Sequence, residues 1–349
     1  MQPLALAFHV VRDAVAFGPG AGELTFARHT EQGKPINGRV VFRCCTRVRC
    51  HDSIQIDNLA GYRPTTRLES TIASTLRIST HVAFSDMKLG FIGTGEITSS
   101  IVTGLCSSVT MPHSIRLSPR NTEIAKKLAN RFSGVSISSC NQEVLDHCDT
   151  IVIAVRPQVA RDVLSELHFR PDHQVVSLVA ALSLRSVSEI VAPAVRVTRA
   201  VPLPSTAKGL SPTGIYPPEP VACDLFAALG TVFAVESENQ FDAMCVVTAT
   251  MASHFALMER IGSWLAQHGI PESKARDYVA RIFYGLTATA IDAPERSFQS
   301  LAGSHATAGG INEQFLRYLI EHGLLTNVSE ALDAVLSRIS TAETSGTAY

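Results

Sequence analysis

The sequence predicts an α/β fold, a doubly wound parallel sheet flanked by helices, followed by an all-helical domain. From Met87 onward, short apolar segments alternate with stretches of helical periodicity, which is the pattern of a parallel sheet with crossover helices. Near residue 237 the alternation stops and a long apolar helical stretch begins. At 349 residues the chain has room for both parts.

Composition indicates a globular protein without a strongly charged surface. Apolar residues make up 46% of the chain and charged residues 17%, and the net charge is −1. A net charge this close to zero produces no long-range electrostatic attraction to nucleic acid or to an anionic membrane, and we expect neither as a partner. Apolar runs such as VVSLVAAL at 175–182 are shorter than the roughly 18–20 residues that span a bilayer.

The eight cysteines show no metal-ligand spacing. RCCTRVRC contains Cys44, Cys45 and Cys50, but no His/Cys pair follows at zinc-finger distance. We expect reduced thiols, no metal site and a cytoplasmic location.

Residues 1–86 lack a sustained period of either kind, and short apolar clusters alternate there with Gly, Arg, Thr and Ser. The opening has no basic region ahead of an apolar core, so it does not read as a secretory signal. The alternatives are an overlong start upstream of a natural Met87 and a transit segment. In either case we expect poor order and no catalytic role.

The α/β domain is expected over residues 87–236. Its predicted strands lie at 88–93, 114–118, 135–138, 150–155, 174–179 and 195–201. Helical stretches lie between them, for example TEIAKKLANRF at 122–132 and PQVARDVLSEL at 157–167.

The helical domain is expected over residues 237–340, followed by a polar tail at 341–349. It opens with one long helix ending near Gly269, and Pro271 then stands in a favourable position to begin the next helix. The long helix is apolar around much of its girth, so it needs cover on several sides. We expect a homodimer, or a higher homo-oligomer, built on this domain.

The motif GFIGTGEIT indicates a dinucleotide-binding turn. Gly93 allows a sharp turn, and Gly95 lets the backbone approach a pyrophosphate at the positive end of the next helix. Thr98 takes the third fingerprint position, where Gly or Ala is usual, and is expected to loosen the helix–strand contact slightly. The candidate cofactor residues of this turn are Gly93, Thr94, Gly95, Glu96 and Ile97.

The end of the second strand predicts the choice of cofactor. NAD-preferring sites usually carry Asp or Glu there, whereas this chain has Ser118, Pro119, Arg120 and Asn121. A hydroxyl, a guanidinium and an amide suit a 2′-phosphate, so we predict NADPH, with NADH as the alternative, and assign Ser118, Arg120 and Asn121 to its binding. The competing interpretation is an exposed arginine in an ordinary loop.

From Met87 to about Ser340 the chain resembles the pyrroline-5-carboxylate reductase family. The resemblance rests on GFIGTGEI, IVIAVRPQ, VTRAVPLP and SHATAGGINEQFL, in that order. It implies a Rossmann-type NADP-binding domain, a helical dimerisation domain, and hydride transfer to the C=N carbon of a cyclic imino acid. It also implies that Ala154, Val155, Arg156 and Pro157 border the cofactor.

The last motif resembles the family's Ser-Pro-Gly-Gly-Thr-Thr signature, whose backbone N–H groups hold the substrate carboxylate. The residues that this implies for substrate binding are Gly309, Gly310, Ile311 and Asn312. For the proton step, the candidates are Asn312 as an N–H donor, Thr307 as a relay and His305 as a titrating group. Ser253 is a second candidate for the relay. His254 also titrates, but a core or interface histidine is the better interpretation of its place beside Phe255. Glu259 stands where the family keeps a glutamate, and a helix-capping or ion-pair role explains it equally well.

Several residues depart from the family pattern. Leu203 replaces an asparagine near the nicotinamide end, Arg156 replaces a lysine, and VTATMAS at 247–253 lacks both glycines of a Ser-Gly-Ser-Gly-Pro-Ala-Tyr segment. Ile311 and Asn312 replace two threonines. Three functions therefore stay open: reduction of 1-pyrroline-5-carboxylate to proline, reduction of another cyclic imine or small carbonyl acid, and a non-catalytic nucleotide-binding regulator.

Overall fold

The computed structural model describes residues 22–29, 35–42, 56–57, 87–108, 114–180 and 182–345. The chain divides into two compact units, Met1–Ser79 and Thr80–Tyr349. Cys44, Cys45 and Cys50 lie outside the described residues, as does most of the stretch for which we expected poor order.

The described residues of the first unit form a small antiparallel sheet that the sequence pattern did not predict. Strands β1 (Gly22–His29) and β2 (Pro35–Phe42) pair from Gly22↔Phe42 to His29↔Pro35. A two-residue strand, β3 (Ile56–Asp57), adds to β2.

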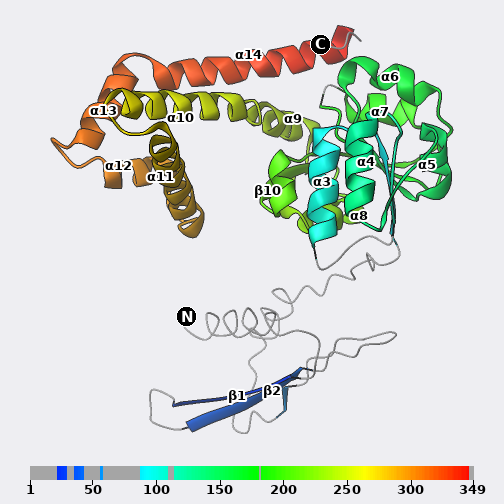
Figure 1. The fold of residues 1–349 in the computed structure, drawn as a ribbon, viewed down its shortest axis with the longest axis horizontal. Helices are drawn as coiled ribbons and strands as arrows, with labels where there is room; N and C mark the ends of the chain where they lie inside the picture. Colours follow the sequence, from blue (N-terminus) through cyan, green and yellow to red (C-terminus); the bar gives the residue numbers. More distant parts are fainter. Residues whose placement is uncertain are drawn as a thin grey trace. The chain divides into compact units, whose positions relative to one another are not determined.

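The second unit begins with an eight-stranded sheet in the order β11-β10-β9-β8-β7-β4-β5-β6. Figure 1 shows this part of the chain with its flanking helices. Its strands are β4 (Lys88–Ile92), β5 (Ser114–Leu117), β6 (Val135–Ile137), β7 (Thr150–Ile153), β8 (Gln174–Ser177), β9 (Arg196–Val201), β10 (Ser211–Tyr216) and β11 (Gly230–Ala234). The six predicted strands are confirmed. Strands β10 and β11 were not predicted, and β10 runs antiparallel to β9, so the sheet is mixed at that edge.

Helices cover both faces of this sheet because side chains on a strand alternate between faces. Leu89 and Phe91 of β4 belong to the cluster with helices α3 (Glu96–Ser107), α4 (Thr122–Arg131) and α8 (Pro220–Ala227). Ile151 and Ile153 of β7 belong to the cluster with α5 (Asn141–His147), α6 (Pro157–Ser165) and α7 (Leu184–Ile190). The strand order reverses between β4 and β7, which is where such folds bind ligands.

The helical domain contains α9 (Glu238–Val247), α10 (Thr250–Gln267), α11 (Glu272–Asp292), α12 (Phe298–His305), α13 (Ile311–Glu321) and α14 (Leu324–Ser345). The single long helix that we expected is wrong in one respect, because a turn at Thr248 and Ala249 divides it. There the N–H groups of Thr248 and Ala249 bond carbonyls three residues back, and the Thr248 hydroxyl donates to the Cys245 carbonyl at 2.7 Å. The polar stretch assigned to a tail is helical as far as Ser345.

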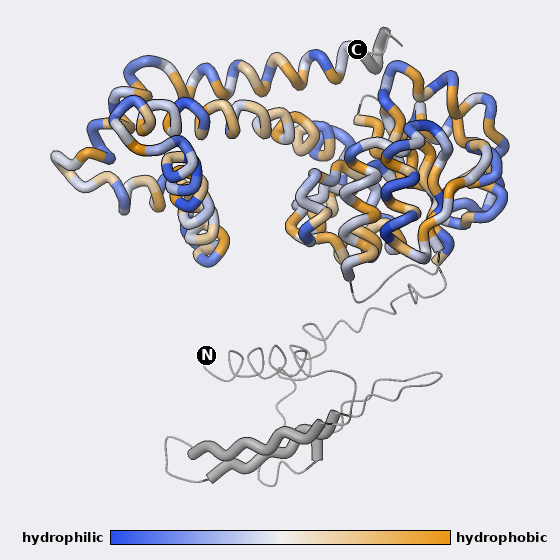
Figure 2. Tube along the Cα trace, in the orientation of Figure 1, coloured by the Kyte–Doolittle hydropathy of each residue, from blue (hydrophilic) through white to orange (hydrophobic). Residues whose placement is uncertain are grey.

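Hydrophobic residues recur along the helices of the helical domain (Figure 2), and many of their side chains are exposed in a single chain. None of the side chains of α10 is buried; Phe255 is 67% exposed and Trp264 is 56% exposed. Taken as one helix of 30 residues, Glu238–Gln267 is long and apolar enough to cross a membrane, which the shorter apolar runs did not suggest. A helix that meets partner subunits on several sides has the same composition.

Candidate active site

The first constellation lies where β4, β5 and β7 end. Because these strands are parallel, their carboxyl ends meet at one edge, and Ile92 pairs with Ile153 while Phe91 pairs with Leu117. The Ala154 N–H donates to the Ile92 carbonyl at 2.8 Å, and the Ser118 N–H donates to the Phe91 carbonyl at 3.0 Å. The structure therefore brings together the predicted cofactor residues of three separate motifs.

Gly93 fulfils both requirements expected of a glycine in the turn. Its φ is +102°, a region that side-chain-bearing residues rarely adopt. A Cβ at this position would lie 2.6 Å from the Ala154 carbonyl oxygen, so no side chain fits between the ends of β4 and β7.

Gly95 leaves space in front of helix α3. It is the N-cap residue of that helix, no described side chain caps the helix start, and a Cβ here would meet no described atom within 4 Å. The first N–H groups of a helix, here those of Glu96 and Ile97, have no partner inside the helix. This open, positively polarised end fits a pyrophosphate.

Ser118 holds this turn from the neighbouring strand. Its hydroxyl accepts the Gly93 N–H at 2.9 Å and lies 3.1 Å from the Thr94 hydroxyl, which donates to the Ser118 carbonyl at 2.9 Å. Ser118 is fully buried and Thr94 is 4% exposed. The Ser118 hydroxyl is thus engaged with the turn, and Arg120 and Asn121 remain as the polar side chains on the surface of this loop.

Thr98 was expected to loosen the helix–strand contact slightly, but the structure shows it bonded to the turn that joins the strand to the helix. Thr98 is fully buried, and its hydroxyl donates to the Gly93 carbonyl at 2.7 Å. A side chain larger than alanine is accommodated because its polar end finds a partner in the turn itself. Thr98 therefore ties the helix to the turn.

The loop after β5 exposes the side chains of Arg120 and Asn121. Asn121 adopts a left-handed backbone (φ 65°), caps α4 through a 3.5 Å contact with the Ile124 N–H, and is exposed. Arg120 is exposed and has no hydrogen-bond or ion-pair partner among the described residues. On the other side of the turn, Arg156 is exposed at the N-cap of α6, directly before Pro157.

The second constellation is the turn between α12 and α13. Gly309 carries the left-handed conformation (φ +72°), whereas Gly310 is the N-cap residue with φ −85°. A Cβ at Gly310 would lie 2.9 Å from the Thr307 carbonyl oxygen. Gly309 is thus required for its left-handed backbone conformation, and Gly310 is required because a side chain there would collide with the Thr307 carbonyl.

Hydrogen bonds inside this turn decide which groups can meet a ligand. The Gly309 N–H donates to the Glu313 carboxylate at 2.7 Å, and the Gly310 N–H donates to the Thr307 carbonyl at 2.8 Å. The N–H groups of Ile311, Asn312 and Glu313 form the first turn of α13 and have no partner inside the helix. An anion at this turn would therefore meet residues 311–313 more directly than the N–H groups of the two glycines.

Two of the side chains assigned to the proton step, those of Asn312 and His305, contact backbone carbonyls within four to seven residues of themselves in the sequence. The Asn312 amide donates to the His305 carbonyl at 3.1 Å, and the His305 Nδ1 lies 2.8 Å from the Leu301 carbonyl. His305 is exposed and lines a hollow between α11 and α12 together with Ala290 and Phe298. His254 packs edge-on against the Phe283 ring, with centroids 5.3 Å apart, which favours its structural interpretation.

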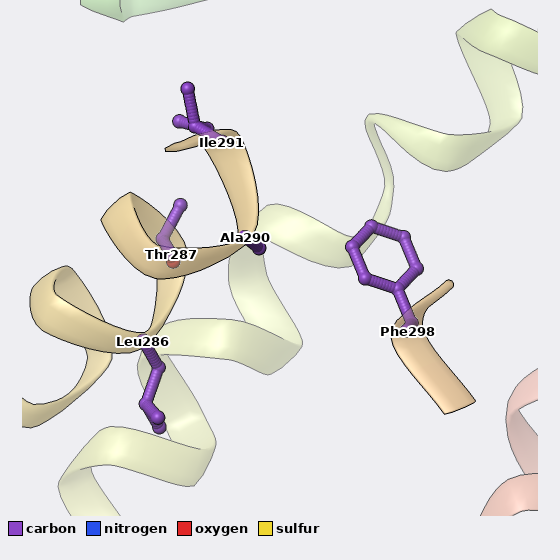
Figure 3. A pocket seen from close by; sticks show the side chains of 5 residues that line it. All are labelled: Leu286, Thr287, Ala290, Ile291 and Phe298. Atoms are coloured by element: carbon purple, nitrogen blue, oxygen red, sulfur yellow. The ribbon is translucent and has the colours of Figure 1, made fainter. Parts of the chain in front are cut away.

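The two constellations do not meet within one chain. Figure 1 shows α12 and α13 at the end of α10 that lies away from the sheet, whereas the dinucleotide turn opens α3. Beside the second constellation, an open hollow of about 400 Å³ is lined by Leu286, Thr287, Ala290, Ile291 and Phe298 (Figure 3). Its lining is almost wholly apolar, which suits a protein surface better than a charged small molecule.

Sequence reasoning missed Arg199, the most unusual side chain near the sheet's carboxyl edge. It is 1% exposed and binds two carboxylates, those of Glu238 (2.6 Å) and Asp242 (3.0 Å). The available signal was an arginine among apolar residues in the middle of the strand RVTRAV, followed by two acids four residues apart in a later helix.

The comparisons with known proteins agree with the two-domain division. Residues 88–181 match the model for NADP oxidoreductase coenzyme F420-dependent, and residues 238–342 match the model for pyrroline-5-carboxylate reductase dimerisation. The chain is similar to the pyrroline-5-carboxylate reductase of Vibrio alginolyticus, with 25% identity over 262 residues that cover 72% of this chain and 96% of the relative. The Escherichia coli enzyme is 24% identical over 263 residues, 72% of this chain and 97% of the relative.

Solved structures share the fold. The 1-pyrroline-5-carboxylate reductase of Streptococcus pyogenes superposes with a TM-score of 0.65 at 24% identity, covering 74% of this chain and 99% of that one. The pyrroline carboxylate reductase of Plasmodium falciparum, solved with NADP bound, gives 0.64 at 18% identity, with the same coverage. The match to the family's dimerisation domain over the helical part, together with the similarity to its members over both domains, supports a divergent member of the pyrroline-5-carboxylate reductase family.

Proposed function

We propose that this protein is an NADPH-dependent reductase of the C=N bond of a cyclic imino acid, with 1-pyrroline-5-carboxylate, reduced to proline, as the first candidate substrate. The observation that carries the proposal is the open helix start at Gly95, placed at the strand-order reversal of a chain whose helical part matches the family's dimerisation domain. We also propose a cytoplasmic location and no role for nucleic acid or a membrane.

The cofactor would be held by groups on three strand ends. The N–H groups after Gly95 suit the pyrophosphate, and Arg120 with Asn121 suits a 2′-phosphate because a guanidinium forms paired hydrogen bonds with phosphate oxygens. Arg156 adds a second cation at the same edge. When bound, the reduced nicotinamide supplies the hydride for the reaction.

The substrate carboxylate would be held at the start of α13. The N–H groups of residues 311–313 point along the helix axis toward its positive end, so they favour an anion. Because this turn and the dinucleotide turn lie apart within one chain, we propose that the turn of one subunit faces the cofactor of another. The exposed apolar helices would then bury their side chains in the same interface.

The protein has little to do in the proton step. Reduction adds a hydride to the imine carbon and a proton to its nitrogen, and an imine basic enough to arrive protonated needs only orientation. Asn312 can donate a hydrogen bond but cannot supply the proton. His305, whose Nδ1 is engaged with Leu301, keeps its Nε2 for proton exchange with solvent or substrate.

A second candidate is a larger or more apolar cyclic imine. Ile311, at the proposed carboxylate turn, is 82% exposed, and Leu203 stands at the end of β9 with its N–H bonded to the Ser211 hydroxyl. Both positions offer hydrocarbon where the family pattern has a polar side chain, and this favours a substrate with more apolar surface.

NADPH oxidation by the purified full chain tests these proposals. The assay would compare 1-pyrroline-5-carboxylate, 1-pyrroline-2-carboxylate and piperideine carboxylates, beside rescue of a proline auxotroph. Rapid oxidation with the first substrate, together with rescue, supports the proline assignment. Preference for a six-membered ring supports the second candidate, and NADPH binding without oxidation on any imine would contradict both.

A further inference from the structure

We infer that Arg199 is a positioning residue that, together with Glu238 and Asp242, holds the first helix of the helical domain against the carboxyl edge of the sheet. The kinetic part of this inference rests on the proposed reductase function, whereas its structural part does not. The three residues, called here the Arg199 cluster, join β9 to α9 beside an apolar cluster in which Phe241 and Val246 pack against Val201 and Tyr216.

The guanidinium of Arg199 donates hydrogen bonds to three partners through its two terminal nitrogens. Nη1 donates to Glu238 Oε1 at 2.6 Å and to Asp242 Oδ1 at 3.0 Å, and Nη2 donates to the Ala180 carbonyl at 2.9 Å. The guanidinium carbon lies 4.5 Å from the centroid of the Phe241 ring. Its contacts therefore come from helix α9 and from the loop that follows β8.

Glu238 extends the cluster to a third element. Its Oε1 also accepts the N–H of Leu184, the first residue of α7, at 2.5 Å. One carboxylate oxygen thus joins the start of α7, the strand β9 and the start of α9. The position of α9 is tied to two segments, 180–184 and 199–203, that both follow or end strands at the carboxyl edge.

That edge is where the cofactor is proposed to lie. Arg199 pairs with Ser177, the last residue of β8, and the strand ends two residues later at Val201. Pro202 and Leu203 follow, and the Leu203 N–H is held by the Ser211 hydroxyl. A shift of β9 against α9 would therefore move Pro202 and Leu203, the segment that the family pattern places near the nicotinamide end of the cofactor.

Stability alone is a poor explanation for this cluster. Removing a guanidinium and two carboxylates from water is costly, and well-packed apolar residues often replace such clusters without loss. Apolar partners are at hand, since Phe241, Cys245, Val246 and Ile339 form a buried cluster beside it. Burial raises the pKa of Asp242, and the neighbouring Arg199 opposes that rise, so each charge depends on the other for its place.

Hydrogen bonds are directional, so they can set the relative orientation of two elements more closely than apolar contacts do. Hydrogen bonds from one rigid, planar group to three partners specify both the distance and the angle between elements. We therefore expect the Arg199 cluster to determine how the helical domain is set relative to the cofactor cleft. Cofactor binding itself, at the ends of β4 and β5, should not depend on it.

The test compares Arg199→Lys and Asp242→Asn with the matched control Arg116→Lys. Arg116 forms an ion pair with Glu143 at 3.3 Å, from β5 to α5, and both residues lie in the α/β domain. Each full-length variant would be measured by hydrogen–deuterium exchange, NADPH titration and steady-state NADPH oxidation with the preferred imine.

We expect the two cluster variants to exchange at least tenfold faster over 182–190 and 238–247, with NADPH affinity within twofold of the parent. Turnover number should fall tenfold or more, with a smaller effect in Asp242→Asn, which keeps the shape of the side chain. In Arg116→Lys, faster exchange should be confined to β5 and α5, and turnover should stay within twofold.

Two results would overturn the inference. One is unchanged exchange at 182–190 and 238–247 in a folded Asp242→Asn variant. The other is an equal loss of turnover in Arg116→Lys, which would mean that general loosening is responsible. If the parent reduces no imine, the reductase proposal fails, and the exchange and titration results still decide whether the cluster positions α9. If Arg199→Lys does not fold, Asp242→Asn decides alone.

Discussion

The backbone N–H of Gly93 donates to the hydroxyl of Ser118 over 2.9 Å, from the turn after β4 to the end of β5. This bond joins the two motifs that the cofactor is proposed to touch, the phosphate turn and the loop that carries Arg120. Ser118 is fully buried, so water cannot replace its hydroxyl if it is lost.

Ser118→Ala should weaken NADPH and NADH binding alike. It leaves the Gly93 N–H and the Thr94 hydroxyl with one partner fewer, at a cost of about 1–2 kcal/mol, roughly tenfold in affinity. Titration of both cofactors measures the effect. Ser136→Ala, which removes only a 3.5 Å contact with the Ile115 carbonyl, is the control. A loss confined to NADPH would mean that the hydroxyl contacts the 2′-phosphate instead.

Arg120→Asp should weaken NADPH binding far more than NADH binding. The substitution removes a cation and places a carboxylate near the 2′-phosphate, while an acid at this position suits the free ribose hydroxyls of NADH. The ratio of the two dissociation constants should change by at least tenfold. Arg161→Asp on α6 controls for the change in net charge. Equal changes for both cofactors would identify Arg120 as an ordinary surface residue.

The two glycines before α13 should respond differently to substitution. Gly310→Val places a side chain against the Thr307 carbonyl and in the approach to the proposed carboxylate site, so imine turnover should be lost while NADPH affinity stays within twofold. Gly309→Ala has open space but a left-handed backbone, which costs about 1–2 kcal/mol of stability. Melting temperature, NADPH affinity and turnover measured on the same preparations separate the two effects. Full activity in a folded Gly310→Val variant would contradict the site.

Two inactive variants should restore activity when they are mixed. Gly93→Val blocks the dinucleotide turn, and Gly310→Val blocks the substrate turn. If each active site takes one turn from each subunit, half of the sites in a mixed dimer are intact. Statistical mixing then restores about a quarter of the parental activity. Co-refolding followed by an NADPH-oxidation assay provides the measurement. No recovery in proven mixed dimers would show that both turns act within one chain.

Acid should destabilise the α/β domain through His173. This residue is fully buried; its Nδ1 accepts the Arg170 N–H at 3.0 Å and its Nε2 lies 3.1 Å from the Leu145 carbonyl. Burial, and then the nearby Arg170, lower the pKa of His173 from its usual 6.5. The unfolded chain therefore binds a proton before the folded chain does, and the free energy of unfolding falls as the pH drops below about 6.5.

The measurement is urea unfolding between pH 7.5 and 5. His173→Gln should flatten the pH dependence, although it lowers stability at neutral pH. The exposed His168 supplies the matched control variant, His168→Gln. An unaltered slope in His173→Gln would assign the acid sensitivity to other groups.

Local patterns in the sequence determined the domain order, six of the eight strands in the main sheet, and the dinucleotide turn. These features depend on residues close together in the chain: apolar periodicity, the need for glycine at Gly93, and the helix start after Gly95. The helical nature of residues 238–340 was equally local, because periodicity and the capping signal at Pro271 are local properties.

Tertiary contacts decided the rest. Strand β10 joins the sheet antiparallel to β9, which follows from pairing partners and not from its own composition. The Ser118 hydroxyl accepts a hydrogen bond from the turn, and the Thr98 hydroxyl donates one to it. Only the folded structure brings these partners together. Arg199 is paired with acids that lie about forty residues away in the sequence. A sequence shows which side chains carry donors and acceptors, but burial and long-range pairing determine which of them are satisfied inside the fold and which remain for a ligand.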